Sequence, residues 1–137
     1  MPIPSVLLDT NILVSANLNP LGLEQMVYSH ALQHSLRLFV STPILLEYES
    51  VLRRPTFRFP HEEVTESLAQ IRLNSTFIVP TTTLSVSPDE SDNRFLECAE
   101  AAHVDFLVTG NLRHFPAVWK STRIINAREL VESVFHL

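Results

Sequence analysis

Short apolar runs rich in β-branched and aromatic residues alternate along this chain with longer segments of helical periodicity. The strand-like runs lie at residues 5–8, 36–40, 76–79, 106–109 and 123–125, and the helical segments at about 23–35, 41–54, 60–73, 91–103 and from 126 onward. Strands that alternate with helices in this way form βαβ units, whose helices connect neighbouring parallel strands. The pattern therefore predicts an α/β fold with a central, mostly parallel sheet of four or five strands.

The length and composition of the chain suit one folded domain. The chain has 137 residues, of which 45% are hydrophobic, and it contains two glycines. A chain of this size can enclose a single hydrophobic core, and so few glycines leave little room for flexible linkers. We therefore expect residues 1–137 to form a single domain.

The charge balance limits how the chain can meet nucleic acid. The formal net charge is -5 and the isoelectric point is near 5.6. Non-specific binding to nucleic acid depends on Lys and Arg side chains that neutralise phosphates, so any such contact is expected to be local. Two interpretations remain open for a set of basic residues: they contact RNA phosphates, or they are scattered surface charges. These residues are Arg53, Arg54, Arg94 and Arg113.

The cysteine content and the apolar segments point to the cytoplasm. Cys98 is the single cysteine, so it has no internal partner for a disulfide. The first residues lack a basic start followed by an uninterrupted apolar stretch, and no apolar segment reaches the roughly 20 residues that cross a bilayer. We expect a cytoplasmic protein without a membrane role.

Three oxygen-bearing side chains are placed where they can meet. Asp9 directly follows the run 5–8, and Asn111 comes shortly after the run 106–109. The carboxyl ends of parallel strands share one edge of the sheet, where open α/β folds bind ligands. Asp92 lies at helical spacing with apolar residues that must face the sheet. The helix dipole alone stabilises an acid in a first turn, but the three positions together indicate a site for a hard divalent cation.

A fourth acid is ambiguous on physical grounds. Glu47 and Glu49 both flank the apolar stripe of the helix 41–54. Periodicity does not choose between them, and either side chain can simply face solvent.

Four segments, in this order and spacing, resemble the PIN-domain family. They are VLLDTNILVSA from Val6, LLEYESVLRRPTF from Leu45, DESDNRFLECAEAAHVDFLVTGN from Asp89, and HFP from His114. The likeness is strongest to the branch of toxins from toxin–antitoxin pairs, which is related to the VapC-type ribonucleases. The resemblance implies a three-layer α/β/α fold and cleavage of RNA with Mg²⁺ or Mn²⁺.

The resemblance also assigns the catalytic acids. Asp9 matches the first acid of the family motif, Glu47 the acid of the following helix, and Asp92 the acid that opens a later helix. The family pattern thus selects Glu47 over Glu49. These three acids are expected to be catalytic and to bind the metal.

The remaining site positions come from the same likeness. Asn111 is at the position where many relatives carry a fourth acid, and it is the fourth expected metal ligand. Asn11 and Thr109 match positions that support the site. Ser91 replaces an acid beside the retained Asp92. Because Asn111 lowers the charge of the site by one, a second metal should be weakened more than the first, which favours a single ion.

The acidic positions and the resemblance together favour a metal-dependent endoribonuclease, and the resemblance alone implies that it acts as the toxin of a toxin–antitoxin pair. The resemblance implies an RNA substrate, an antitoxin protein that covers the active groove, and a homodimer. One alternative is a PIN-fold module that binds RNA or a protein without cutting. Another is a Mg²⁺ phosphoesterase, although Asp9 lacks the second acid two residues later that an aspartyl-phosphate hydrolase carries.

Overall fold

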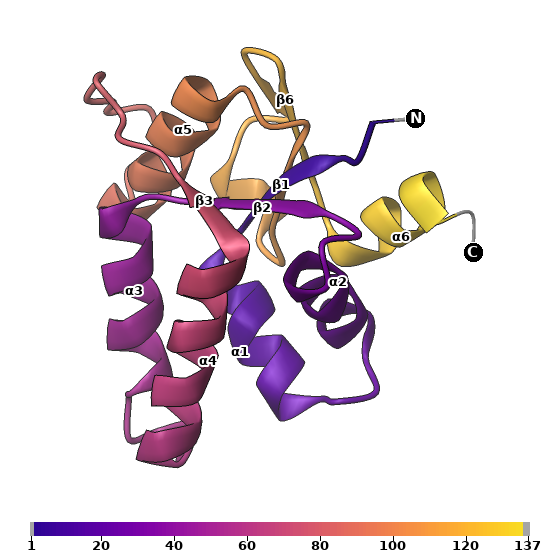
Figure 1. The fold of residues 1–137 in the computed structure, drawn as a ribbon. Coiled ribbons are helices and arrows are strands. Elements are labelled where there is room, and N and C mark those ends of the chain that lie inside the picture. Colours follow the sequence, from indigo (N-terminus) through magenta and orange to yellow (C-terminus); the bar gives the residue numbers. More distant parts are fainter. Residues whose placement is uncertain (1, 136–137) are drawn as a thin grey trace.

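The computed structural model describes residues 2–135, and its helices and strands alternate as an α/β fold requires (Figure 1). In chain order the elements are β1 (Ser5–Leu8), α1 (Thr10–Leu18), α2 (Leu23–Leu32), β2 (Arg37–Val40), α3 (Thr42–Leu52), α4 (His61–Asn74), β3 (Ser75–Phe77), α5 (Glu90–Ala102), β4 (Phe106–Val108), the 3-10 helix η1 (Leu112–His114), β5 (Val118–Trp119), β6 (Thr122–Ile125) and α6 (Ala127–Phe135).

The strands form one mostly parallel sheet in the order β3-β2-β1-β4-β6-β5. All neighbouring pairs are parallel except β5 and β6, which pair antiparallel. The expected fold class is therefore confirmed. The sheet of the described residues has six strands rather than four or five, because a two-residue strand, β5, folds back onto β6.

The two central strands bring distant parts of the chain to one edge of the sheet. Leu8, the last residue of β1, is in register with Val108, the last residue of β4. The next residue after each strand, Asp9 and Thr109, therefore leaves the sheet beside the other. The backbone N–H of Asp9 continues the ladder by donating to the carbonyl of Val108 at 2.9 Å.

Helices cover both faces of the sheet, which makes the fold three-layered. Figure 1 shows α1, α2, α3 and α4 together on one side of the strands and α5 on the other. The C-terminal helix α6 packs beside α2. This arrangement follows from right-handed connections, which place the helices of successive crossovers on opposite faces when the strand order reverses.

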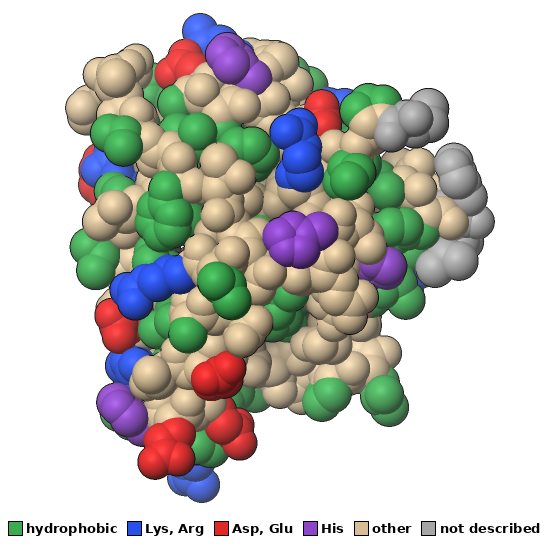
Figure 2. Space-filling view, viewed as in Figure 1, with side chains coloured by type: hydrophobic (Ala, Val, Ile, Leu, Met, Phe, Trp, Pro, Cys, Tyr) green, Lys and Arg blue, Asp and Glu red, His purple; other side chains and the backbone are tan. Residues whose placement is uncertain are grey.

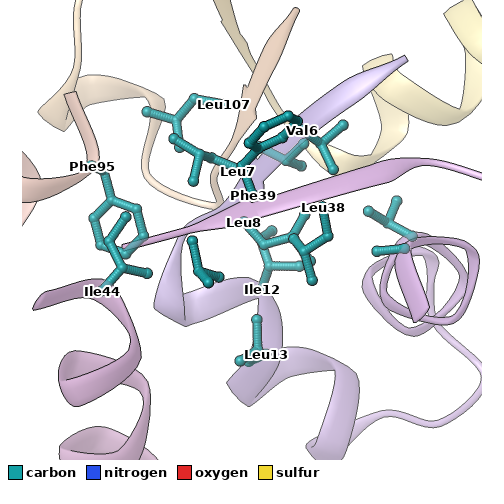
Figure 3. Packing of buried hydrophobic residues seen from close by; sticks show 14 of the residues in the cluster. Val6, Leu7, Leu8, Ile12, Leu13, Leu38, Phe39, Ile44, Phe95 and Leu107 are labelled. Carbon is teal, nitrogen blue, oxygen red and sulfur yellow. The ribbon is translucent and has the colours of Figure 1, made fainter. Parts of the chain in front are cut away.

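The core lies on both sides of the central strands. Val6, Leu7 and Leu8 are fully buried, as expected for a parallel strand covered on both faces. Figure 3 shows how side chains of β1, β2, α1, α3 and α5 converge on these residues. The packing holds the carboxyl end of β1, and with it Asp9, in a fixed place.

The helix α1 was not expected from the sequence. Its segment contains several β-branched residues. The buried residues Thr10, Ile12, Leu13 and Ala16 share one helix face, but the apolar side chains of Val14 and Leu18 lie outside that face, so the sequence shows little contrast between an apolar and a polar side. The Asp9 side chain caps the helix by accepting from the backbone N–H of Thr10. The tertiary position between β1 and α2 therefore decides the conformation of this segment, rather than its periodicity.

The longest described helix, α4, has 14 residues and carries acids in its first turn. Within residues 2–135, no helix combines the length and the apolar character that crossing a bilayer requires.

Candidate metal centre

Asp9 is held by three hydrogen bonds at the carboxyl end of β1. Its Oδ1 accepts from the backbone N–H of Thr10 at 2.8 Å. Its Oδ2 accepts from the hydroxyl of Thr109 at 2.7 Å and from the amide of Asn11 at 3.2 Å. The residue is only 7% exposed. The carboxylate is thus oriented before any ligand arrives.

The predicted supporting residues tie the loop after β4 to the start of α1. Thr109 is fully buried, and its hydroxyl oxygen also accepts from the backbone N–H of Asn111 at 2.9 Å. The side-chain oxygen of Asn11 accepts from the backbone N–H of Gly110 at 3.0 Å. Asn111 itself is exposed and occupies the N-cap position of η1 without a side-chain capping bond, so it lies at the rim of the site rather than inside it.

Asp92 reaches the site from the first turn of α5 and is 7% exposed. Its Oδ2 lies 3.5 Å from the hydroxyl of Ser87. The turn that carries it is fixed by Asn93, a fully buried amide that accepts from the backbone N–H groups of Val86 and Ser87 at 3.0 and 2.8 Å. Asn93 also donates to the carbonyl of Ser87 at 2.9 Å. Sequence reasoning did not single out Asn93, although an amide on a buried helix face was a signal for such a role.

Glu47 is positioned through its neighbour in α3. The hydroxyl of the buried Tyr48 donates to the backbone carbonyl of Leu8, which immediately precedes Asp9. This bond anchors α3 at the end of β1. Glu47 is half-buried there, whereas Glu49 forms an ion pair with Arg53 at 3.0 Å. The two glutamates that periodicity did not separate therefore have different surroundings.

The three predicted acids share one electrostatic environment. Burial, and next the charge of Asp9, raise the pKa of Asp92 to about 6. Burial raises the pKa of Glu47, with Arg54 opposing and Asp9 adding to the shift. Burial also raises the pKa of Asp9, against the hydrogen bonds from Thr109 and Thr10. Desolvation and mutual repulsion of carboxylates are relieved when a cation binds, so this donor set fits a hard divalent ion.

A further group at the site was not predicted from the sequence. Asp89, Asp92 and His114 each offer one ligand atom, and these atoms lie within 4.8 Å of one another. Nδ1 of His114 lies 3.6 Å from Oδ2 of Asp92. His114 belongs to η1, a short element that the sequence did not predict, so its position next to α5 could not be inferred.

Two of the predicted RNA-binding arginines are engaged by acids of their own helices. Arg94 contacts Glu97 at 2.9 Å and Glu90 at 3.3 Å, and it is partly buried. Arg53 contacts Glu49 at 3.0 Å. Their charges are therefore largely compensated locally.

The other two arginines are exposed. Arg54 lies close enough to the site to lower the pKa of Glu47. Arg113 lies in η1, directly before His114. On the face in Figure 2, the Lys and Arg side chains stand apart instead of forming one basic patch.

Two adjoining depressions open beside the candidate centre. They share Gly110 and Asn126, and their volumes are about 490 and 560 Å³. The first reaches the rim of the centre at Asn111 and His114, and the second continues to the loop between α1 and α2 and to the start of α6. Together they extend away from the acids along the carboxyl edge of the sheet.

Comparison with protein families places these features in a known context. The family model of the PIN domain matches residues 5–113, which is most of the chain. The chain therefore belongs to the PIN-domain family, whose members are generally nucleases that use divalent metals. Comparison with curated proteins gave no match.

Proposed function

We propose that the protein is a metal-dependent endoribonuclease that hydrolyses RNA phosphodiesters with Mg²⁺ or Mn²⁺. The observation that carries this proposal is the shared environment of Asp9, Glu47 and Asp92, which come from three separate elements. Asp9 and Asp92 are more than nine-tenths buried. Burying a carboxylate without a compensating cation lowers the stability of the folded protein. The presence of these buried carboxylates at one sheet edge therefore supports a role as metal ligands. Asn111 is the proposed fourth ligand.

The residues of the chain have separate tasks in this proposal. Asp9, Glu47 and Asp92 would hold a divalent ion, which when bound would activate a water and neutralise negative charge on the phosphate. Thr109 and Asn11 keep Asp9 oriented through the hydrogen bonds that it accepts.

The surface beside the acids supports a polymeric substrate over a small phosphomonoester. The two adjoining depressions give a strand room to continue past the scissile phosphate. Arg113 lines the first depression and Arg128 the second. Guanidinium groups at these places can contact backbone phosphates. Arg54, which is close enough to Glu47 to lower its pKa, is a third candidate for a phosphate contact.

Cleavage of labelled RNA by the purified protein tests the proposal. We expect cleavage with Mn²⁺ or Mg²⁺ and none with EDTA. Glu47→Gln should lower the rate by about a hundredfold or more, whereas Glu49→Gln, a matched change in the same helix, should leave it nearly unchanged. Equal rates for both variants would remove Glu47 from the mechanism.

The exposed amide at position 111 favours a second candidate, a PIN-fold module that binds RNA or a protein without cutting. RNA binding with no metal-dependent cleavage of any RNA would support it. Release of inorganic phosphate from monoesters, with RNA untouched, would instead indicate a phosphoesterase.

We also propose that the chain is one PIN domain that acts in the cytoplasm as a toxin, forms a homodimer and is restrained by an antitoxin protein. The support is the likeness of its motifs to the toxin branch. Expression in a bacterial host should arrest growth, and Asp9→Asn should abolish the arrest. Light scattering of the purified protein reports the oligomeric state.

A further inference from the structure

We propose that His114 is a metal ligand of this centre, acting with Asp92 and Asp89, and that its nitrogen makes the centre favour Mn²⁺ over Mg²⁺. The inference rests on the proposed metal-dependent function and adds a residue and a metal preference to it.

The first observation is the spacing of the donor atoms. The ligand atoms of Asp89, Asp92 and His114 lie within 4.8 Å of one another. Nδ1 of His114 is 3.6 Å from Oδ2 of Asp92, too far for a good hydrogen bond. Two ligands that each bind one ion at about 2.1 Å lie roughly 3 to 4 Å apart. The gap between the two side chains therefore has the size that a shared ion requires.

The second observation is that Asp92 is buried without a close donor. It is 7% exposed, yet among the described residues no donor lies closer to its carboxylate than Ser87, at 3.5 Å. Asp9, which is equally buried, accepts hydrogen bonds at 2.7 and 2.8 Å. Since a buried carboxylate needs either hydrogen bonds or a cation, the Asp92 side chain lacks a partner that an ion beside His114 would provide.

The position of His114 is held from both ends of η1. The backbone N–H of His114 donates to the carbonyl of Asn111 at 3.0 Å. The next residue, Phe115, is buried in the core. These contacts fix the backbone of η1, and Nδ1 of the imidazole lies 3.6 Å from Oδ2 of Asp92 in α5. The ring is half-exposed, so an ion can reach it from solvent.

The chemistry of the donor set decides the metal preference. Mg²⁺ prefers oxygen ligands, whereas imidazole nitrogen binds later transition-series ions more strongly. Mn²⁺ accepts oxygen ligands and also tolerates a nitrogen. A set of carboxylates with one imidazole therefore gains more affinity for Mn²⁺ than for Mg²⁺.

Metal binding to the full-length protein, without RNA, tests the inference. Mn²⁺ bound to the wild-type protein should show electron spin-echo modulation from ¹⁴N of a coordinated imidazole. His114→Ala should abolish this modulation and weaken Mn²⁺ binding about tenfold or more in calorimetry, with less than a threefold effect on Mg²⁺. The matched control His34→Ala alters an exposed histidine that contacts Asn74, and it should change neither readout.

The outcomes separate this inference from the proposed function. Mn²⁺ binding without ¹⁴N modulation in the wild-type protein would overturn the inference, even if RNA is cleaved. Equal losses of Mn²⁺ and Mg²⁺ affinity in His114→Ala would also overturn it. If the modulation is present but no RNA is cleaved, the ligand role stands and the ribonuclease proposal fails. The wild-type spectrum does not depend on how well a variant folds, and Asp89→Asn offers a second variant that should weaken Mn²⁺ binding.

Discussion

The hydroxyl of Thr109 donates a hydrogen bond of 2.7 Å to the carboxylate of Asp9, although the two residues are 100 positions apart in the chain. The bond exists because β1 and β4 are neighbours in register and end at the same level. It makes the loop after β4 a support for the first acid of the site. The fold and the candidate centre are therefore linked through one buried contact.

Replacing Thr109 by valine should keep the shape of the side chain and remove this bond. We expect a loss of about 1.5–3 kcal/mol in the free energy of unfolding, because a buried carboxylate loses a donor. The pKa of Asp9 should rise further, since the Thr109 hydrogen bond lowers it. Metal affinity should fall about 10- to 100-fold. Denaturant melts measure the loss of stability, and calorimetry measures the loss of metal affinity.

Thr109→Ser is the control for this prediction. It keeps the hydroxyl and removes one methyl group, so metal affinity should stay near that of the wild-type protein. If Thr109→Ser and Thr109→Val lose affinity equally, packing rather than the hydrogen bond supports Asp9.

Metal binding should depend on pH through Asp92. Burial and the neighbouring charge of Asp9 raise the pKa of this carboxyl to about 6, so it is largely protonated below that pH. Metal binding must then displace a proton, and affinity should fall about tenfold per pH unit below pH 6 and level off above pH 7. Mn²⁺ titrations of His114→Ala between pH 5 and 8 follow this dependence without the proton competition of the imidazole, which is itself a proposed ligand. An affinity that is constant over that range would contradict the proposed role of Asp92.

The same carboxylate should destabilise the metal-free protein. Its pKa in the folded state is above the ordinary value of 3.8, so the folded state binds more protons than the unfolded state between about pH 4 and 6. Stability is therefore lost as pH rises through this window. Asp92→Asn should raise the free energy of unfolding at pH 7 by about 1–3 kcal/mol without metal. It should also remove the stabilisation by Mn²⁺. A variant less stable than wild type at pH 7 would contradict this account.

Several features could be predicted from the sequence because they depend on local patterns. The strands β1, β2 and β4 are short apolar runs, and a parallel sheet follows from their alternation with helices. Asp9 and Asp92 are visible as acids at a strand end and on a buried helix face. Such positions are exceptional enough to point to a site without knowledge of the tertiary structure.

Other features depend on tertiary contacts that have no local pattern. The segment of α1 shows little contrast between apolar and polar faces, and β5 has only two residues. Both elements therefore depend on contacts with their neighbours and not on a local pattern. Glu47 and Glu49 look alike in sequence, and only the ion pair of Glu49 with Arg53 separates their surroundings.

The position of His114 is the clearest case. Its distance from Asp92 depends on η1, on the buried Phe115 and on the start of α5, which meet only in the folded chain. No spacing in the sequence indicates this contact.

Tyr48 should set the position of Glu47. Tyr48→Phe removes the hydroxyl that donates to the carbonyl of Leu8, and leaving that buried group without its donor should cost about 1–3 kcal/mol in the free energy of unfolding. With α3 less firmly held, the rate of RNA cleavage should fall about three- to tenfold in protein that is still folded. Tyr28→Phe, in α2, is a matched change at a second buried tyrosine and should spare the rate. Equal rates for the two variants would show that the anchor does not position Glu47.

Arg54 and Arg53 are adjacent in sequence but should act differently on RNA. Arg53 is paired with Glu49, whereas Arg54 is exposed and lies near Glu47. If Arg54 contacts a phosphate, Arg54→Gln should weaken RNA binding about three- to tenfold near 0.1 M salt. It should also reduce the salt slope, which is the slope of log K for RNA binding against log salt concentration, by about one in magnitude. Arg53→Gln should change the slope little and act mainly on stability. Arg72→Gln, on α4, controls for the change in net charge. Fluorescence anisotropy at several salt concentrations, in EDTA to prevent cleavage, gives the slopes. An Arg54→Gln slope equal to that of Arg72→Gln would place the RNA path elsewhere.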